Sequence, residues 1–347
     1  MGVNLAPIIV KRIIQLEDLR GKSLAVDANN MLYQFLALTR TPDGTPLKDS
    51  SGNITSHLSG LMFRSTRLMH DYNINLVFVF DGKPPLLKEP EISKRRKARE
   101  KAAKEWKTAL DAGDYATAFS KAVVTSRLTR PMVDDAKRLL SLLGIPFVQA
   151  PSEAEAQAAY MARKGDVWAA SSRDYDSLLF GTPKLLRYLT ISGRKFLPSR
   201  GVSRPLKPEL VNLSELLTHH KITREQLIDI AILIGTDFNQ GTKGIGPKTA
   251  LKLLREHGNL ENLPDNISSR IPKHYDEVRQ IFLAPKVTSD CTCQYGHLYE
   301  DALHEFLCGE RDFSKKRVEF VISRMKEFHS GKKQIGLKKW LPTEIRD

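Results

Sequence analysis

Seven acidic side chains are spaced so that a single site could gather them around divalent cations. Asp27 and Asp81 each end an apolar run, and Asp237 follows an apolar, helix-like segment, although taken alone it could simply solvate a loop. Carboxylate oxygens suit Mg²⁺ or Mn²⁺ rather than zinc. Two such ions about 4 Å apart can activate a water and stabilise the leaving oxygen in phosphodiester cleavage. The candidate metal set is Asp27, Asp81, Glu153, Glu155, Asp174, Asp176 and Asp237.

Two pairs in this set need a defined backbone if they are to converge. In extended chain, Asp174 and Asp176 would point to the same face because side chains alternate. Glu153 and Glu155 would diverge by about 200° within a regular helix, so they converge only on its first turn. Ser152 is suited to be the N-cap, with Glu155 completing a capping box. Capping alone therefore explains Glu155 as well as metal binding does.

The elements that must position these carboxylates follow a strand and helix alternation. The runs 23–27 and 76–81 are typical of buried parallel strands, and a third run, 166–172, follows a helical pattern over 152–163. We therefore predict an α/β fold, with a mainly parallel central sheet flanked by helices. Ligands of such sheets bind beyond the carboxyl ends of the strands, where the acidic residues fall.

The overall composition predicts a polyanionic partner. The chain has 347 residues, is 41% hydrophobic and carries a formal net charge of +14. No apolar run approaches the ~20 residues that span a bilayer, and the start lacks the features of a signal peptide, so we expect an intracellular protein. A zinc site near Cys291, Cys293 and Cys308 is an alternative, but the Cys-x-Cys spacing favours reduced thiols.

A basic segment, 83–130, is too charged for a core and favours helix, so it predicts an exposed helical excursion. Between positions 94 and 107 it holds eight basic and two acidic residues. Four lysines share one helical stripe, whereas a merely solvated face normally mixes both signs of charge. These lysines are Lys94, Lys97, Lys101 and Lys104.

A glycine-rich turn, 241–249, lies between helical patterns at 224–234 and 248–257 and resembles a helix-hairpin-helix. Its glycines would let backbone N–H groups and a helix N-terminus approach the phosphates of a duplex, although a plain tight connection is the alternative. The candidate DNA-binding residues of the turn are Lys243, Gly244, Gly246 and Lys248.

Several motifs together are similar to those of a known enzyme family. They are Val26-Asp27-Ala28, Phe80-Asp81-Gly82-Lys83-Pro84-Pro85, the run 150–158, Ser172-Arg173-Asp174-Tyr175-Asp176 and Gly235-Thr236-Asp237-Phe238. Through nearly the whole chain the sequence resembles the flap endonucleases of the XPG-like structure-specific 5′-nuclease family. The chain ends without the basic extension of eukaryotic nuclear members, so we expect the archaeal type and a cytoplasmic location, or a nuclear one if the protein is eukaryotic.

The resemblance implies a role for particular residues. All seven carboxylates would bind two Mg²⁺ ions, for which Mn²⁺ can substitute, directly or through water. Lys88 and Arg95 would contact the scissile phosphate, Tyr33 would stack on a flipped base, and Gly2 would pack near the active site. Arg64 would contact a strand near the duplex junction. The basic excursion would be the helical arch around the 5′ single strand, and the helix-hairpin-helix would hold K⁺.

The C-terminal tail, 331–347, resembles a motif that binds a sliding clamp (PCNA), with Leu341 in place of the second aromatic residue. A local tether of this kind raises the effective concentration of an enzyme on its substrate. The clamp-binding candidates within 334–341 are Gln334, Leu337, Trp340 and Leu341.

We therefore expect a monomeric 5′ flap endonuclease, with 5′–3′ exonuclease activity, that acts on branched DNA in Okazaki fragment maturation and base excision repair. The alternatives are a 5′ exonuclease or bubble-cutting branch, a scaffold without catalysis, and an RNA-directed nuclease. The expected division is a single nuclease domain, 1–330, followed by the tail. The nuclease domain comprises an N-terminal region 1–98, the arch 83–130 and an internal region 116–258 with the helix-hairpin-helix at 235–257.

Overall fold

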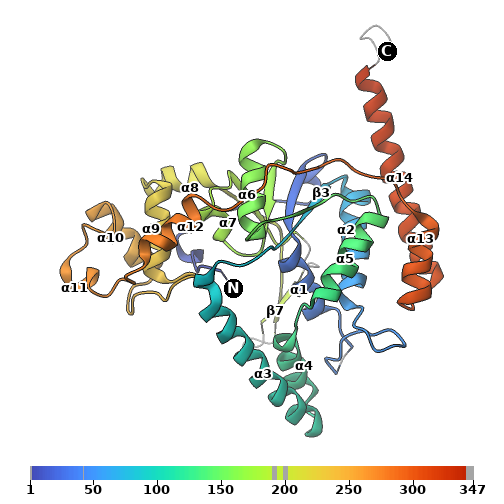
Figure 1. Ribbon diagram of the computed structural model, residues 1–347, viewed down its shortest axis with the longest axis horizontal. Coiled ribbons are helices and arrows are strands. Elements are labelled where there is room, and N and C mark those ends of the chain that lie inside the picture. The colour runs from blue at the N-terminus through green and yellow to red at the C-terminus, as the bar shows by residue number, and fades with distance from the viewer. Residues whose placement is uncertain (1, 42, 190–193, 198–201, 341–347) are drawn as a thin grey trace.

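The computed structural model describes residues 2–41, 43–189, 194–197 and 202–340, with the backbone alone for 194–197, 202–205 and 332–340. At its centre is a seven-stranded sheet in the order β1-β9-β6-β5-β2-β3-β4 (Figure 1). Strands β6, β5, β2, β3 and β4 run parallel, and β9 and β1 add an antiparallel edge. The strands are β1 Arg12–Ile13, β2 Ser23–Asp27, β3 Asn75–Phe80, β4 Phe147–Gln149, β5 Ala169–Ser171, β6 Lys184–Arg187 and β9 Glu209–Asn212.

Helices cover both faces of this sheet because successive side chains of the apolar central strands point to opposite sides. In β3, Phe78 and Phe80 pack into one core with helices of the N- and C-terminal parts, whereas Val77 and Val79 pack against α6. The predicted α/β fold is therefore confirmed. The first layer comprises α1 Ala28–Leu38, α2 Ser56–Tyr72, α5 Arg130–Leu142, α13 Glu300–His304 and α14 Lys315–Trp340, and the second contains α6 Ala154–Lys164.

A further group of helices extends from one end of the sheet around a core of its own. It contains the predicted helix-hairpin-helix, formed by α9 and α10 and the turn between them. None of the described helices is both long and apolar enough to cross a membrane. The group comprises α7 Asp176–Leu179, α8 Leu213–His220, α9 Arg224–Ile234, α10 Pro247–His257, α11 Asp265–Ser268 and α12 Tyr275–Leu283.

The basic excursion forms a helical hairpin that projects from the body of the protein (Figure 1). Helix α3, Glu89–Asp111, packs along α4, Tyr115–Thr125, through small buried side chains such as Ala102 and Ala118. Asp114 caps α4 by accepting a hydrogen bond from the backbone N–H of Thr117 at 3.0 Å. The predicted excursion is thus a hairpin of two helices, and its role as an arch around a single strand stays a prediction. A separate two-stranded ribbon, β7 Arg194–Leu197 with β8 Val202–Pro205, completes the fold.

The C-terminal segment differs from a separate tail beginning at residue 331. Helix α14 is continuous from Lys315 to Trp340, and its C-terminal part leaves the body (Figure 1). The backbone at the clamp-motif positions Gln334, Leu337 and Trp340 is therefore helical, and Leu341 lies outside the described residues.

Candidate active site

The first carboxylates are held by helix starts at the carboxyl edge of the sheet. Asp27 ends β2 and caps α1, accepting a hydrogen bond from the backbone N–H of Asn30 at 2.9 Å. Asp81, just beyond β3, accepts one from the backbone N–H of Ala154 at 2.8 Å. A carboxylate at a helix N-terminus is also favoured by the helix dipole. Each side chain is thereby fixed by an element that neighbours its own strand.

Glu153 and Glu155 do lie at the start of a helix, but the predicted capping box is wrong. Helix α6 begins at Ala154, so Glu153 rather than Ser152 is the N-cap, and it makes no side-chain capping bond. The Asp81 carboxylate takes the place of a local cap. Glu155 instead accepts a hydrogen bond from the Ser172 hydroxyl at 2.6 Å. Neither glutamate caps the helix, and both side chains are turned toward the ends of the strands.

Asp174 and Asp176 are not in extended chain, so the prediction from side-chain alternation is also wrong. They lie on a bend between β5 and α7, where Tyr175 has a helical backbone (φ −90°, ψ −5°) and Asp176 begins α7. Asp176 is fixed by the backbone N–H of Val3, which donates to its Oδ1 at 2.7 Å. A Cβ atom at Gly2 would collide with the same carboxylate, so the expected packing of Gly2 near the site is seen.

The base of the arch supplies two cations that meet these acids. Lys88 forms an ion pair with Glu153, and its Nζ lies 3.4 Å from Asp237 Oδ2. Arg95 Nη2 lies 2.6 Å from Asp237 Oδ1, and its Nε lies 2.9 Å from Glu91. The structure thus brings both predicted phosphate-contacting residues to the carboxylate cluster. Burial opposes the charge of Lys88, yet Glu153 and Asp237 hold its pKa above the usual range.

The cluster holds more negative charge than an apolar environment tolerates. Burial, then the charge of Asp81, raises the pKa of Asp27 well above its ordinary value. Burial and Asp176 do the same to the pKa of Glu155. Burial and the neighbouring Asp237 and Asp174 raise the pKa of Asp176 to about 7. Cations that neutralise the carboxylates would reverse these shifts.

The donor set fits hydrated divalent ions, because every candidate ligand atom is a carboxylate oxygen. Within the described residues, no three His, Cys, Asp or Glu side chains close around one point as direct ligands of a single ion would. Mg²⁺ is usually bound through one or two carboxylates and keeps several waters, which suits this looser arrangement. Cys291, Cys293 and Cys308 are free thiols, and no such group forms at them in this part of the chain.

Comparison with known proteins decides the family. The chain matches the XPG N-terminal domain over residues 1–102 and the XPG I-region over 144–237. It is 47% identical over 345 residues to flap endonuclease 1 of Pyrococcus abyssi, covering 98% of each chain. It is also 47% identical over 340 residues to flap endonuclease 1 of Archaeoglobus fulgidus, covering 98% of this chain and 100% of the relative. This chain belongs to the flap endonuclease 1 family.

Solved structures agree with this family assignment. The structure of flap endonuclease-1 from Methanococcus jannaschii is 41% identical, has a TM-score of 0.76, and is matched over 95% of this chain and 100% of that one. The catalytic core of Rad2, solved in complex with a DNA substrate, shares the fold at 24% identity and a TM-score of 0.68, over 91% of this chain and 96% of that one. The resemblance drawn from the motifs is therefore confirmed.

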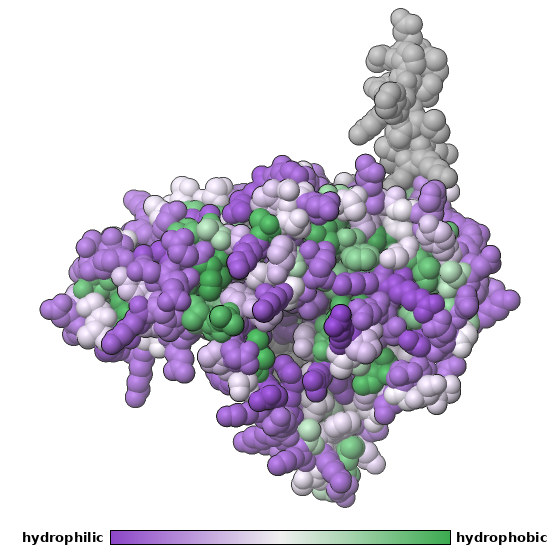
Figure 2. Space-filling model, viewed as in Figure 1, coloured by the Kyte–Doolittle hydropathy of each residue, from purple (hydrophilic) through white to green (hydrophobic). Residues whose placement is uncertain are grey.

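In this flap endonuclease family member, the predicted DNA-binding residues lie outside the acidic cluster. The lysine stripe of α3 is exposed, and Figure 2 shows hydrophilic residues over much of the hairpin. Gly244 has φ +84°, a conformation that disfavours side chains, and Gly246 is the N-cap of α10. Tyr33 is half-buried on α1, and the Arg64 guanidinium lies 5.8 Å from the Phe35 ring. Their contacts with DNA remain predictions.

Sequence reasoning missed several groups that hold the carboxylates. The Val3 N–H and the Ser172 hydroxyl carry no distinctive pattern, since any residue supplies an N–H and serine is common in loops. Asn30 and Gln34 donate hydrogen bonds in the same region and were also missed. Their places, three and seven residues after Asp27 on a helix that it caps, were the available signal.

Proposed function

We propose that this protein is a structure-specific nuclease that hydrolyses DNA phosphodiester bonds at 5′ flaps with two divalent cations, Mg²⁺ or Mn²⁺. The observation that carries the proposal is the meeting of seven acidic positions with Lys88 and Arg95 at the mouth of a basic helical arch. A 5′–3′ exonuclease activity and a role in Okazaki fragment maturation and base excision repair belong to the same proposal.

The cations, held by Asp27, Asp81, Glu153, Glu155, Asp174, Asp176 and Asp237, would supply activation of a water and stabilisation of the leaving oxygen. Lys88 and Arg95 would exchange carboxylate partners for phosphate oxygens when substrate enters. Their positive charge would then stabilise the additional negative charge of a pentacovalent phosphate. Gly2 would keep the N-terminal segment close against Asp176.

The basic surfaces would select the shape of the substrate. The α3 lysine stripe would attract a single 5′ strand without regard to its sequence, because phosphates carry the charge that it recognises. The exposed turn at Gly244 and Gly246, with Lys243 and Lys248 beside it, would bind the backbone of the duplex and a K⁺ ion. Contacts at both places would place the cut near the junction.

The test is an internally labelled DNA with a 5′ flap on a nicked duplex, incubated with Mg²⁺ or EDTA, with single-strand and RNA-flap substrates alongside. Release of the intact flap with Mg²⁺ and none with EDTA is the expected result. Mononucleotides as the sole product would favour a 5′ exonuclease. Tight binding without cleavage would favour a scaffold, and preference for the RNA flap would favour an RNA-directed nuclease.

We further propose that the protein acts as a monomer tethered to a sliding clamp (PCNA) through residues 334–341. The support is the sequence motif together with a helix that carries positions 334–340 away from the body of the protein (Figure 1). Tethering would raise the local concentration of the nuclease on DNA without changing its active site.

A further inference from the structure

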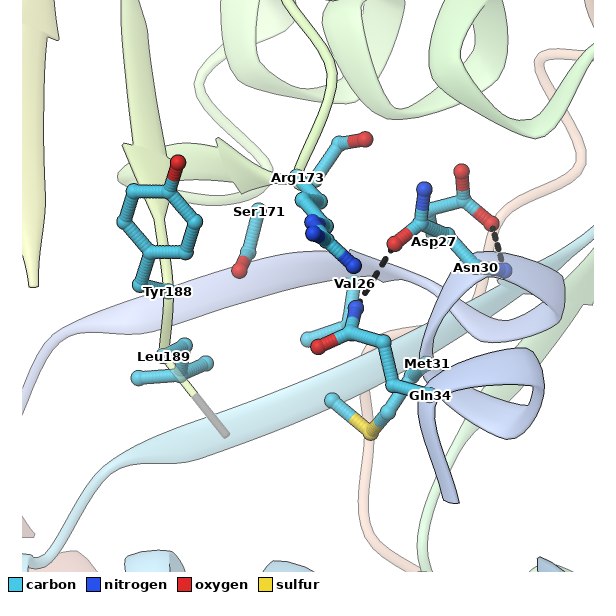
Figure 3. Close-up of a pocket in the computed structure, with 10 residues that line it drawn as sticks. Val26, Asp27, Asn30, Met31, Gln34, Ser171, Arg173, Tyr188 and Leu189 are labelled. Atoms are coloured by element: carbon cyan, nitrogen blue, oxygen red, sulfur yellow. Dashed lines mark hydrogen bonds between the residues drawn. The ribbon is translucent and has the colours of Figure 1, made fainter. Parts of the chain in front are cut away.

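Two side-chain amides form a connected pair on the first turns of α1. Asn30 and Gln34 are four residues apart, so they lie on one face of the helix. Gln34 Nε2 donates to Asn30 Oδ1 at 2.7 Å, and Asn30 Nδ2 donates to Asp174 Oδ2 at 3.1 Å. Figure 3 shows both amides in the hollow beside Asp27, with the bond between them dashed. The pair thus ends on one of the carboxylates of the acidic cluster.

Gln34 determines which way the Asn30 amide faces. A carboxamide has one accepting oxygen and one donating NH₂ group. Because the Asn30 oxygen is engaged by Gln34, its NH₂ group must face Asp174. The reverse orientation would set two NH₂ groups against each other and place an oxygen against a carboxylate. Gln34 therefore donates to Asn30, and Asn30 donates to Asp174.

The Asp174 carboxylate is held by a side-chain amide, whereas Asp27 and Asp176 are held by backbone N–H groups. Asp174 lies on an irregular bend after β5, where its own backbone N–H donates to Ser172 Oγ at 3.2 Å. Within the described residues, the Asp174 carboxylate accepts its hydrogen bond from Asn30 Nδ2. Asn30 also donates its backbone N–H to Asp27 Oδ1. One residue consequently holds two carboxylates that come from the ends of two adjacent parallel strands.

We propose that Asn30, oriented by Gln34, is a positioning residue that sets Asp174 against Asp27 for binding a divalent cation. This inference rests on the proposed function. Hydrogen-bond partners of metal ligands fix ligand orientation, and their removal typically weakens metal binding about 10–100-fold. A carboxylate on a bend without such a partner would lose rotational freedom when it binds an ion, which lowers its affinity for the ion.

The test is calorimetric titration of Mg²⁺ into the full-length protein without DNA. Asn30→Ala and the similarly sized Asn30→Leu both remove the donor to Asp174 without adding charge, and each is expected to weaken Mg²⁺ binding at least about tenfold. Gln34→Leu leaves Asn30 free to turn and is expected to weaken it less. Gln280→Ala, on the exposed face of α12, is the matched amide control and should bind Mg²⁺ as the wild type does. Flap cleavage by Asn30→Ala should recover at high Mg²⁺.

Unchanged Mg²⁺ affinity in both Asn30 variants would overturn the inference, and so would weaker DNA binding with unaltered Mg²⁺ binding, which would make Asn30 a substrate contact. If Asn30→Ala does not fold, Gln34→Leu provides the test. Unchanged Mg²⁺ affinity in that variant would show that Gln34 does not orient Asn30. Absence of Mg²⁺ binding by the wild type would instead overturn the metal site of the proposed function, and the inference with it. Melting in EDTA verifies that each variant is folded.

Discussion

Individual carboxylates in this protein are held by hydrogen bonds that come from elsewhere in the chain. The backbone N–H groups of Ala154 and Val3 donate to Asp81 and Asp176, respectively. The Asn30 side chain donates to Asp174. The identities of the acids could be predicted from the sequence, because strand ends and motifs indicate them. Their supports could not, because a backbone N–H or a distant amide reaches its acid only through the tertiary fold.

The raised pKa of Asp176 predicts that its charge destabilises the metal-free fold. A folded pKa of about 7 against an ordinary 3.8 means that stability falls as pH rises through that interval. Asp176→Asn, which can still accept from Val3, is expected to melt several degrees above the wild type in EDTA at pH 8. The gain should shrink at pH 5, where the wild-type carboxyl is protonated. An equal or lower melting temperature at pH 8 would contradict the shift.

His57, fully buried on α2, predicts a second pH dependence that is independent of metal. Burial lowers its pKa from 6.5 to about 4, with Asp135 and Arg311 as the charged groups nearby. Because the folded pKa is depressed, stability is complete above pH 6.5 and is lost as pH falls toward 4. Between pH 7 and pH 5 this residue should account for about 2 kcal/mol of unfolding free energy.

Denaturant unfolding at both pH values checks this, with His57→Leu as the comparison. The variant should lose less stability on acidification than the wild type, whatever its stability at pH 7. If both proteins lose the same amount between pH 7 and pH 5, His57 is not the responsible group.

Among the elements, the parallel strands and the basic hairpin were predictable because their patterns are local. Strand β2 lies at the predicted 23–27, and the hairpin of α3 and α4 occupies the predicted excursion. The start of α6 was not predictable in detail, because Asp81, just beyond β3, replaced the local serine cap. Nor was the bend at Asp174, since a short apolar run does not show where a strand stops.

The lysine stripe of α3 should govern the entry of the single strand. Reversing two charges, Lys97→Glu with Lys101→Glu, is expected to raise KM for a flap substrate about tenfold while the rate at saturation changes less, because phosphate contacts act mainly through attraction. Lys164→Glu, an exposed lysine at the end of α6, is the control. Steady-state cleavage at two salt concentrations provides the measurement. Equal KM values for the double variant and the control would contradict a role of the stripe in binding.

The whole molecule combines an acidic edge, a basic helical hairpin and a glycine-rich turn around one sheet, and its fold matches that of the flap endonuclease-1 from Methanococcus jannaschii. Motifs spread along the chain predicted the family because each one contributes acidic residues to the same cluster. The continuous course of α14 was not foreseen, since a polar sequence is compatible with both helix and tail.

At this scale the clamp proposal predicts that Trp340→Ala leaves flap cutting intact in isolation but abolishes stimulation by a cognate sliding clamp. The reason is that the tether changes local concentration and not chemistry. Lys338→Ala, within the same segment, is the control. Cleavage time courses with and without clamp make the comparison, and full stimulation of the Trp340 variant would place the docking site elsewhere.

The central claim is that the acidic cluster is the catalytic site and that other surfaces of the protein bind the DNA. Flap cleavage by Asp176→Ala tests this claim most directly. The variant and the wild type are compared on one labelled 5′-flap DNA in Mg²⁺, with flap affinity measured separately. We predict similar affinity and a rate lower by more than about a hundredfold, equivalent to ~2.7 kcal/mol of activation free energy. Cleavage at the wild-type rate would contradict the assignment of the cluster as the catalytic site.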